Sequence, residues 1–266
     1  MAMKIQAAGI DMSVARSGTG MPLVLVHGFP LDGRMWANQL QAFAGLHDVI
    51  VPDLRSAGGS GVTAGEVTME RYADDLAALL DALEVREPIV LCGLSMGGYI
   101  ALAFWHRHRA RLKGLVLTDT RATADAPEAA AGRRATADKV EREGSAELVE
   151  QMLPKLLSTT TQAKHPDVVD EVRSMMLAQP AEGVAAAARG LARRNDWTHE
   201  LKNIELPTLV MVGAEDAITT PADMQGMASA IAGSTYVELP GAGHLPPMET
   251  PQAFDAELTK FLRRFE

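Results

Sequence analysis

The first 120 residues alternate between short, mainly apolar runs and longer segments in which apolar residues recur every three or four positions. The short runs end at glycine, proline or polar residues, which is the pattern of strands buried on both faces of a sheet. The longer segments are typical of helices with one buried face. The runs interpreted as strands are Pro22–Val26, Asp48–Val51, Pro88–Cys92 and Leu115–Thr118.

The clearest helical segment is Thr68–Leu83, in which methionine, tyrosine and leucine side chains mark one face. Thr68 is well placed to cap its first turn. A second helix is predicted at Tyr99–His106, directly after a strand. At the start of the chain, Met3–Ala8 and Met12–Arg16 can pair as an antiparallel hairpin. Strands therefore alternate with helices, as in a parallel sheet covered on both faces.

The same alternation returns near the end of the chain. Thr208–Val212 and Tyr236–Leu239 are predicted strands, and Ala253–Arg264 is a predicted closing helix. These segments extend the sheet that the first 120 residues begin.

The middle of the chain, Arg121–Asn195, contains no strand pattern and is rich in alanine, glutamate and arginine. Pro127, Pro166 and Pro180 stand where helices can begin. The pattern predicts about four helices inserted between two strands of the sheet.

The predicted fold is therefore α/β, with a mostly parallel central sheet, helices on both faces and a helical insertion after the sixth strand. Residues 1–120 and 196–266 form the core, and residues 121–195 form the insertion. We interpret the insertion as a lid, because ligands of open α/β sheets bind at the carboxyl ends of the strands. The alternative is a helical bundle packed elsewhere on the core.

Composition and charge narrow the function classes. Hydrophobic residues make up 47% and charged residues 22%, as in an ordinary globular protein, and the formal net charge is −9. This charge argues against nucleic acid, because phosphate binding needs a basic face. The one cysteine, Cys92, excludes an intramolecular disulfide and stands in an apolar run, where a buried core residue is expected. Met1–Ile10 has no secretion signal, and the apolar runs are too short for membrane spans, so a cytoplasmic protein is expected.

Gly93-Leu94-Ser95-Met96-Gly97 matches the G-x-S-x-G motif of a nucleophile elbow. The motif follows a predicted strand and precedes a predicted helix, which is the context that the elbow requires. The glycines allow the strand and the helix to cross closely, and the turn exposes the Ser95 hydroxyl. Ser95 is therefore the candidate nucleophile.

A serine nucleophile needs a base, and His244 is the best placed histidine. It lies in the loop Pro240–His244 after the last predicted strand, from which it can reach the carboxyl edge of the sheet. The other histidines lie at helix ends, in connections or in the insertion, and His27 precedes a turn where backbone geometry is the simpler requirement. These residues are His27, His47, His106, His108, His165 and His199.

The acid of a triad should follow the strand Thr208–Val212, where Glu215 and Asp216 are both candidates. Asp216 is favoured because it lies further past the turn, with Glu215 as its solvated neighbour. The chain order Ser95, Asp216, His244 is the order that serine α/β enzymes use.

Two backbone N–H groups can form an oxyanion hole, those of Met96 and Phe29. Met96 follows the nucleophile, and Phe29 lies in the turn after an early strand. Phe29 and Trp36 are candidates for substrate binding, and core packing is the alternative for both of them and for residues of the insertion. The residues of the insertion weighed in this way are Met152, Leu153, Met175 and Met176.

Taken together, these segments resemble the α/β-hydrolase superfamily over almost the whole chain. The matching pieces are His27–Pro30, Asp53–Arg55, Gly93–Gly98, Asp216 and Gly243-His244. Within the superfamily the chain resembles small bacterial carboxylesterases, 3-oxoadipate enol-lactonases and cofactor-free perhydrolases. The resemblance implies a lid after the sixth strand, in agreement with the inserted helices.

One departure from the family pattern is Ser56, which stands where relatives often carry glycine in the loop after the fourth strand. A loop of different shape is therefore expected there. Family members that act on haloalkanes or epoxides use an aspartate at the elbow, which Ser95 excludes. The chain has no zinc-ligand spacing and no dinucleotide or phosphate fingerprint, so no cofactor and no metal are expected.

The function predicted from the sequence is hydrolysis of carboxylic esters through an acyl-enzyme on Ser95. An enol-lactonase uses the same triad and is the nearest alternative, with a perhydrolase side activity as a further one. A non-catalytic ligand-binding protein of the same fold is the alternative from another class. The expected partner is a small ester or lactone, with no nucleic acid and no membrane.

Overall fold

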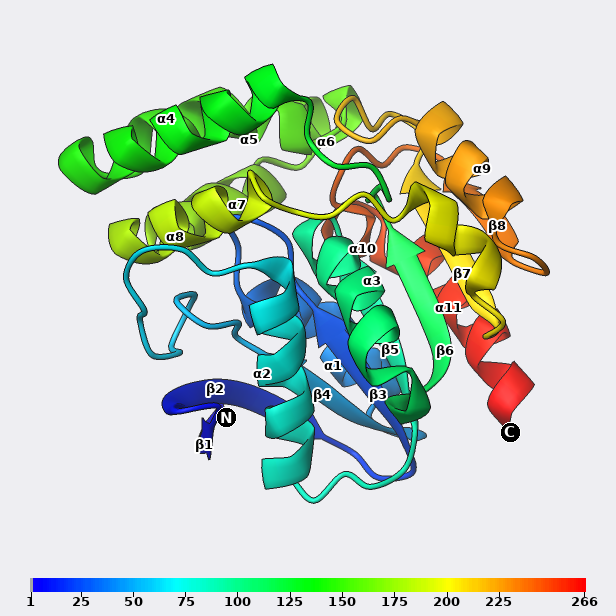
Figure 1. Cartoon of the computed structure of the whole chain (residues 1–266). Coiled ribbons are helices and arrows are strands. Elements are labelled where there is room, and N and C mark those ends of the chain that lie inside the picture. Colours follow the sequence, from blue (N-terminus) through cyan, green and yellow to red (C-terminus); the bar gives the residue numbers. More distant parts are fainter. Residues whose placement is uncertain (1) are drawn as a thin grey trace.

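The computed structural model describes residues 2–266, which contain one eight-stranded sheet in the order β1-β2-β4-β3-β5-β6-β7-β8 (Figure 1). Strand β2 is antiparallel to β1 and β4, and the other neighbouring pairs are parallel. The strands are β1 (Met3–Ala7), β2 (Ile10–Ser17), β3 (Met21–Val26), β4 (His47–Pro52), β5 (Ile89–Leu94), β6 (Leu112–Thr118), β7 (Thr208–Gly213) and β8 (Thr235–Leu239). The mostly parallel sheet predicted from the apolar runs is confirmed.

The side chains of each central strand divide between two cores. In β3, Leu23 and Leu25 join the core on one face, and Val24 and Val26 join the core on the other, because successive residues of a strand point to opposite faces. This explains why the strands are continuously apolar. The helices on the first face are α1 (Ala37–Phe43) and α11 (Pro251–Leu262), and those on the second are α2 (Met69–Ala82), α3 (Met96–His108) and α9 (Pro221–Ala230).

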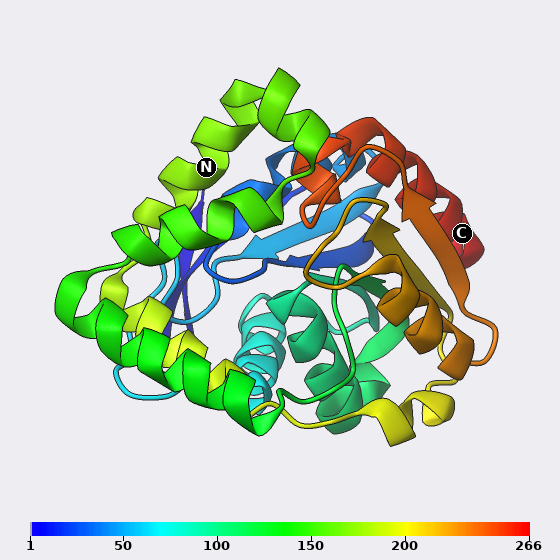
Figure 2. The same cartoon turned by 90° about the horizontal axis from the view of Figure 1, so that it is seen from above.

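Five helices lie between β6 and β7, where the sequence predicts about four, and we refer to them as the inserted helices. Figure 1 shows them together beyond the upper end of the sheet, and Figure 2 shows them on the side away from β8 and the C-terminus. They are α4 (Pro127–Glu143), α5 (Ala146–Leu156), α6 (Thr159–Lys164), α7 (Pro166–Leu177) and α8 (Ala181–Leu191).

Proline marks the start of three of these helices but not of the other two. Pro127 and Pro166 begin α4 and α7, and Pro180 directly precedes α8. Helix α5 begins after Gly144, whose φ of 82° ends α4. Helix α6 begins at the capping residue Ser158. Glycine and serine boundaries inside an alanine-rich segment are weaker signals than proline, so the sequence pattern underestimates the number of helices.

The loop after β4 accommodates the unusual Ser56 with a left-handed backbone, φ 66°. This conformation favours glycine. The Ser56 hydroxyl accepts a hydrogen bond from the Thr63 N–H at 2.8 Å, which holds the loop closed. A Cβ on Gly183 of α8 would lie 1.9 Å from the Ser56 carbonyl oxygen, so an inserted helix rests directly on this loop.

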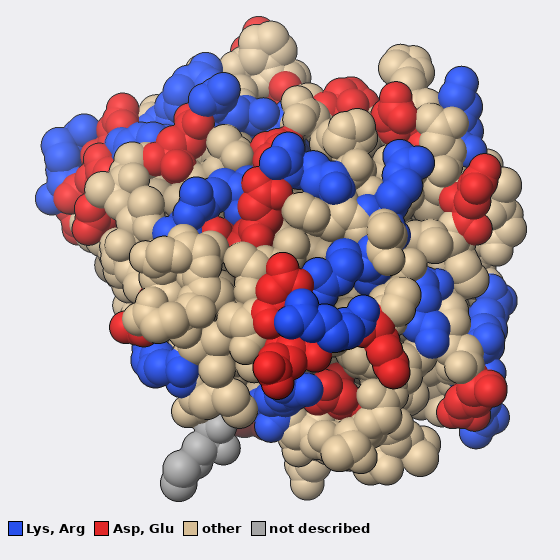
Figure 3. Space-filling view, turned by 60° about the horizontal axis from the view of Figure 1, so that its bottom comes forward, with Lys and Arg blue, Asp and Glu red and all other residues tan. Residues whose placement is uncertain are grey.

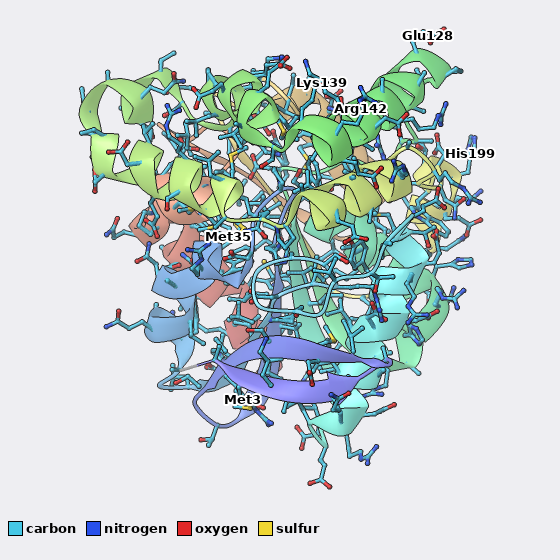
Figure 4. All side chains as sticks on the ribbon, turned by 90° about the vertical axis from the view of Figure 1, so that its left-hand side faces the viewer. Met3, Met35, Glu128, Lys139, Arg142 and His199 are labelled. Carbon is cyan, nitrogen blue, oxygen red and sulfur yellow. The ribbon has the colours of Figure 1, made fainter. Side chains whose placement is uncertain are left out.

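Charged side chains of both signs are interspersed on the face seen in Figure 3. Several of the chain's arginines are paired with acids, such as Arg107 with Asp74 at 2.8 Å. Figure 4 labels Lys139 and Arg142 on α4, and Met35 beneath the inserted helices. Among the described residues, no helix combines the length and apolarity needed to cross a membrane.

Candidate active site

Ser95 occupies the turn between β5 and α3, with φ 55° and ψ −113°. A Cβ on Gly93 would lie 2.2 Å from the Gly97 carbonyl oxygen, and a Cβ on Gly97 would lie 2.2 Å from that of Val26. Only glycine therefore permits this crossing of strand and helix. The Ser95 N–H donates to the Thr118 carbonyl of β6 at 3.0 Å. The segment forms the strained strand–turn–helix of a nucleophile elbow.

Two loops at the carboxyl edge of the sheet bring Asp216 and His244 together. Asp216 follows β7 and His244 follows β8, and His244 Nδ1 lies 2.8 Å from Asp216 Oδ2. Both residues are buried. A carboxylate can only accept, so the imidazole proton faces it from Nδ1, and Nε2 is left to take a proton.

The surroundings of Asp216 keep it ionised. Its Oδ1 accepts from the N–H groups of Ile218 at 2.7 Å and Thr219 at 3.1 Å, and its Oδ2 accepts from the Thr219 hydroxyl. Burial by itself raises the pKa of Asp216, but the hydrogen bond and charge of His244, with these further donors, lower it to about 2. The carboxylate can therefore orient His244 and stabilise its cation.

Asp119 is a second buried acid at this edge, and the sequence interpretation missed it. It directly follows β6 and is fully buried. Its carboxyl accepts from the Gly213 N–H at 2.9 Å and the Thr118 hydroxyl at 3.0 Å. Burial and the charge of Asp216 raise the pKa of Asp119 well above its usual value. The signal that pointed to Asp216, an acid at the end of a predicted strand, could have found it.

One ligand atom each of Asp119, Asp216 and His244 lie within 4.8 Å of one another. A cation here would compete with the hydrogen bonds that Asp216 accepts from His244 and from its own loop. The donor set therefore fits an orienting role for Asp216 better than a metal site, and the absence of a metal stays a prediction.

The two expected oxyanion donors lie beside Ser95. Met96 begins α3 immediately after it, and Phe29 follows Gly28 at the end of β3. A Cβ on Gly28 would lie 3.3 Å from the Ser95 Cβ, so this loop passes close to Ser95. Within residues 2–266, neither the Phe29 nor the Met96 N–H is paired with a protein acceptor. Both groups are thus free to stabilise a negatively charged oxygen.

His27 holds the Phe29 loop in place. Its Nε2 accepts from the Leu54 N–H at 3.0 Å, and its Nδ1 lies 2.9 Å from the Gly28 carbonyl. An N–H donor at Leu54 requires an unprotonated Nε2, so the proton lies on Nδ1. Burial lowers the pKa of His27. Both ring nitrogens are occupied, which agrees with the backbone role expected for His27.

A cavity of about 380 Å³ joins Ser95, His244, Phe29 and Met96. Its remaining walls come from α3, from three of the inserted helices and from the loop after β7. These wall residues are Tyr99, Arg133, Met152, Leu156, Leu191 and Ile218. The sequence-based candidates for nucleophile, base and oxyanion donors therefore all border one cavity.

Most of the proposed pocket residues do not line this cavity. Trp36 is fully buried and packs against Phe254 with ring centroids 5.8 Å apart, so it is a core residue and not a substrate contact. Leu153, Met175 and Met176 are likewise core residues. Of the four candidate pocket residues in the inserted helices, Met152 is the one that lines the cavity. Spacing along a helix shows the apolar face but not which neighbour covers it.

Arg133 is a pocket residue that the sequence interpretation did not name. Its side chain pairs with Asp125, which Arg194 also contacts at 2.7 Å. Arg194 lies over the Tyr99 ring, 4.5 Å from its centroid. Two guanidinium groups around one carboxylate leave a net positive charge beside the cavity.

Glu215 and the remaining histidines lie apart from the cavity. Glu215 is exposed, as expected, and accepts from the Thr159 hydroxyl at 2.8 Å. His108 pairs with Asp74 at 2.8 Å, and His106 stacks on Trp197 with centroids 4.6 Å apart.

The elbow serine, the Asp216–His244 pair and the strand order together define a hydrolase of the α/β type. The family model described as "alpha/beta hydrolase fold" matches residues 21–251. The chain belongs to this family.

Several relatives cover nearly the whole chain. A solved thermophilic esterase from Thermogutta terrifontis is 47% identical with a TM-score of 0.97, over 99% of this chain and 98% of that one. The enol-lactonase from Burkholderia xenovorans LB400 is 30% identical with a TM-score of 0.91, over 98% of this chain and 100% of that one. The 3-oxoadipate enol-lactonase 2 of Acinetobacter baylyi is 29% identical over 87% of this chain and 84% of the relative.

Proposed function

We propose that this hydrolase cleaves carboxylic esters through an acyl-enzyme on Ser95. The observation that carries the proposal is that Ser95 and His244 border one cavity while Asp216 binds the far nitrogen of the imidazole. The similarity to an esterase over 99% of the chain supports the same class of substrate. The proposed triad is Ser95, His244 and Asp216.

In the proposed reaction, the Ser95 oxygen attacks the ester carbonyl carbon while His244 Nε2 takes the hydroxyl proton. The carbonyl oxygen becomes negatively charged against the Phe29 and Met96 N–H groups, each of which is worth about 3 kcal/mol of barrier. Collapse of this intermediate expels the alcohol, which leaves with the proton from His244. A water molecule then attacks the acyl-enzyme by the same route and releases the acid.

The inserted helices act in this proposal as a lid, and residues 121–195 form the lid segment. Helices α4, α5 and α8 contribute Arg133, Met152, Leu156 and Leu191 to the cavity walls. Apolar walls around a small cavity suit short acyl or alcohol groups.

The first test compares the wild type with Ser95→Ala, using p-nitrophenyl acetate and butyrate. We expect kcat/KM to fall by at least about 10³-fold, and a fluorophosphonate probe to label only Ser95, as read by mass spectrometry. Ser229→Ala is the matched control, because the exposed Ser229 hydroxyl donates a hydrogen bond only to the Gln225 carbonyl within α9. Folded wild-type protein with neither turnover nor label would favour the ligand-binding alternative.

A lactonase is the second candidate, favoured by Arg133 in the cavity wall. The name of the Acinetobacter relatives denotes a lactone of 3-oxoadipate, a dicarboxylic acid, so their substrate carries a carboxylate. We expect Arg133→Ala to raise KM about 10-fold or more for carboxylate-bearing lactones and little for neutral esters, because a charge-assisted hydrogen bond is lost. Arg134→Ala, which alters an exposed neighbour, is the control. Equal effects on both substrate types would contradict anion recognition by Arg133.

A further inference from the structure

The backbone N–H groups of three consecutive residues, Gly243, His244 and Leu245, donate hydrogen bonds to two residues, Glu249 and Leu156. The N–H groups of Gly243 and Leu245 donate to the same oxygen of Glu249, Oε1, at 2.9 and 3.0 Å. The N–H of His244 itself donates to the Leu156 carbonyl at 2.9 Å. Glu249 ends the short helix α10 (Pro246–Glu249), and Leu156 ends α5. The backbone of the proposed base is therefore held from one side by a carboxylate and from the other by an inserted helix.

The second oxygen of Glu249 reaches the inserted helices. Its Oε2 accepts from the Ser158 N–H at 2.7 Å. Ser158 is buried, and its hydroxyl donates to the Gly241 carbonyl at 2.9 Å. A Cβ on Gly243 would lie 2.5 Å from the Ser158 nitrogen. The junction between α5 and α6, residues 156–158, is thus in direct contact with the loop that carries His244.

The loop of the proposed acid is tied to the next residue of the same segment. The N–H and the hydroxyl of Thr159 donate to Glu215 Oε2 at 3.1 and 2.8 Å. Glu215 precedes Asp216 and donates its own N–H to the Ala242 carbonyl at 2.9 Å. This second carboxylate contacts the inserted helices without touching the amides of His244, which makes it a matched comparison for Glu249.

We propose that Glu249 is a positioning residue that sets the place of His244 and couples it to the inserted helices through Ser158. The inference rests on the proposed function, in which His244 Nε2 must meet the Ser95 hydroxyl. Proton transfer depends steeply on the distance between the two atoms, so a small displacement of the loop lowers the rate of the chemical step. A shift of the junction 156–158 moves the Glu249 carboxylate and the Leu156 carbonyl together, and His244 follows.

A carboxylate is the group that this geometry requires. Oε1 accepts two N–H groups and Oε2 accepts a third, so both oxygens act only as acceptors. A glutamine has one accepting oxygen and an NH₂ group. Glu249→Gln must therefore either lose the Ser158 bond or direct its NH₂ group at the amides of Gly243 and Leu245. The substitution keeps the size of the side chain and breaks either the bond to Ser158 or the bonds to the two amides beside His244.

The test measures p-nitrophenyl acetate turnover and the rate of fluorophosphonate labelling for wild type, Glu249→Gln and Glu215→Gln. For Glu249→Gln we expect kcat to fall about 10- to 100-fold with KM changed less than about two-fold. The labelling rate constant should fall by a similar factor, while labelling still reaches the whole folded population. Glu215→Gln should keep both rates within about three-fold, because it leaves all three hydrogen bonds of the Glu249 carboxylate in place.

The outcomes separate a positioning role from a structural one. A Glu249→Gln protein that labels with the wild-type rate constant, whether fully or only in its folded fraction, overturns the proposal. Glu249→Asp, which keeps both acceptor oxygens on a shorter side chain, should label at an intermediate rate, and it provides the comparison if the glutamine variant does not fold. A wild type that neither turns over nor labels contradicts the proposed function itself, which is a distinct result.

Discussion

Asp119 and Asp216 lie within one buried corner at the ends of neighbouring strands, yet the pKa values of their carboxyl groups are shifted in opposite directions. Asp216 is surrounded by donors from Ile218, Thr219 and His244, which lower its pKa to about 2. Asp119 has two donors and faces the negative charge of Asp216, so burial and repulsion raise its pKa. One negative charge at this corner is enough to stabilise the imidazolium, and two would repel each other.

Asp119→Asn should gain stability relative to the wild type as the pH rises. The raised pKa means that wild-type folding is opposed by ionisation of Asp119 above about pH 4, the usual value in the unfolded chain. Asparagine does not titrate, keeps an acceptor for the Gly213 N–H and tolerates the left-handed φ of 45° at this position. Urea denaturation at pH 4, 6 and 8 measures the difference. If the free energy of unfolding of Asp119→Asn minus that of the wild type decreases as the pH rises, Asp119 is ionised in the folded protein.

Asp216→Asn should lose stability relative to the wild type as the pH rises, and it should also lower the enzyme's activity. A pKa lowered from 3.8 to about 2 corresponds to about 2 kcal/mol of stability that is present above pH 4 and lost as the pH falls toward 2. The amide also favours the wrong tautomer of His244, so kcat should fall by about 10⁴-fold. Unfolding free energies at pH 7 and pH 3, with ester turnover, test both expectations. Destabilisation that is equal at the two pH values would argue against an ionised carboxylate.

Among the elements, α8 is the inserted helix that packs closest to the loops of the core. Cβ atoms on Gly183 and Gly190, seven residues apart on one face, would lie 1.9 Å from the Ser56 oxygen and 1.7 Å from the Val67 oxygen. The Val67 N–H also donates to the Ala186 carbonyl at 3.1 Å. Small residues on this face allow the backbone of α8 to contact the backbone of the loops and to close one side of the cavity.

Gly190→Ala and Gly132→Ala should change stability in opposite directions. At Gly190 an added methyl group meets the Val67 carbonyl and forces α8 away, which should cost about 1–3 kcal/mol. At Gly132 in the exposed face of α4, nothing lies within 4 Å, so alanine should stabilise by about 0.5–1 kcal/mol. Urea denaturation of both variants measures this contrast. Stabilisation by Gly190→Ala would mean that α8 is not seated on the loop in solution.

In the molecule as a whole, the inserted helices share their apolar cores with the sheet. Val149 of α5 and Met175 of α7 belong to the same buried cluster as Leu25 and Cys92. Leu191 of α8 belongs to the cluster on the other face. Ala137 of α4 and Ala185 and Ala188 of α8 form a third cluster within the insertion. Three alanines bury little apolar surface compared with the two shared cores, so we expect one cooperative transition.

Cys92 should report that transition. It is fully buried in β5, and burial raises the pKa of its thiol, so a thiol reagent should leave the native protein unmodified. In urea, modification of the one thiol should follow the same midpoint as the loss of helical circular dichroism, to which the inserted helices contribute strongly. Helical signal lost at lower urea than Cys92 exposure would show that the inserted helices unfold independently.

Much of this molecule could be predicted from residues close together in the chain. The elbow at Ser95 is a local strand–turn–helix, so its glycines and its position after β5 are visible in the sequence. His244 and Asp216 were found because each follows an apolar strand, and parallel strands end at one edge. Asp119 follows the apolar strand β6 in the same way.

The sequence by itself determined the order of the strands along the chain, the place of the elbow and the loops that carry the other proposed site residues, because periodicity and turn chemistry are local properties. Only the tertiary structure decided that Trp36 is a core residue, that Arg133 borders the cavity and that Glu249 holds the amides around His244. Arg133 borders the same cavity as Ser95, and the Leu156 carbonyl accepts from the His244 N–H, although each pair is far apart in the chain and only packing brings it together. A pattern within one helix shows which face is buried, but the partner that covers this face depends on the whole fold.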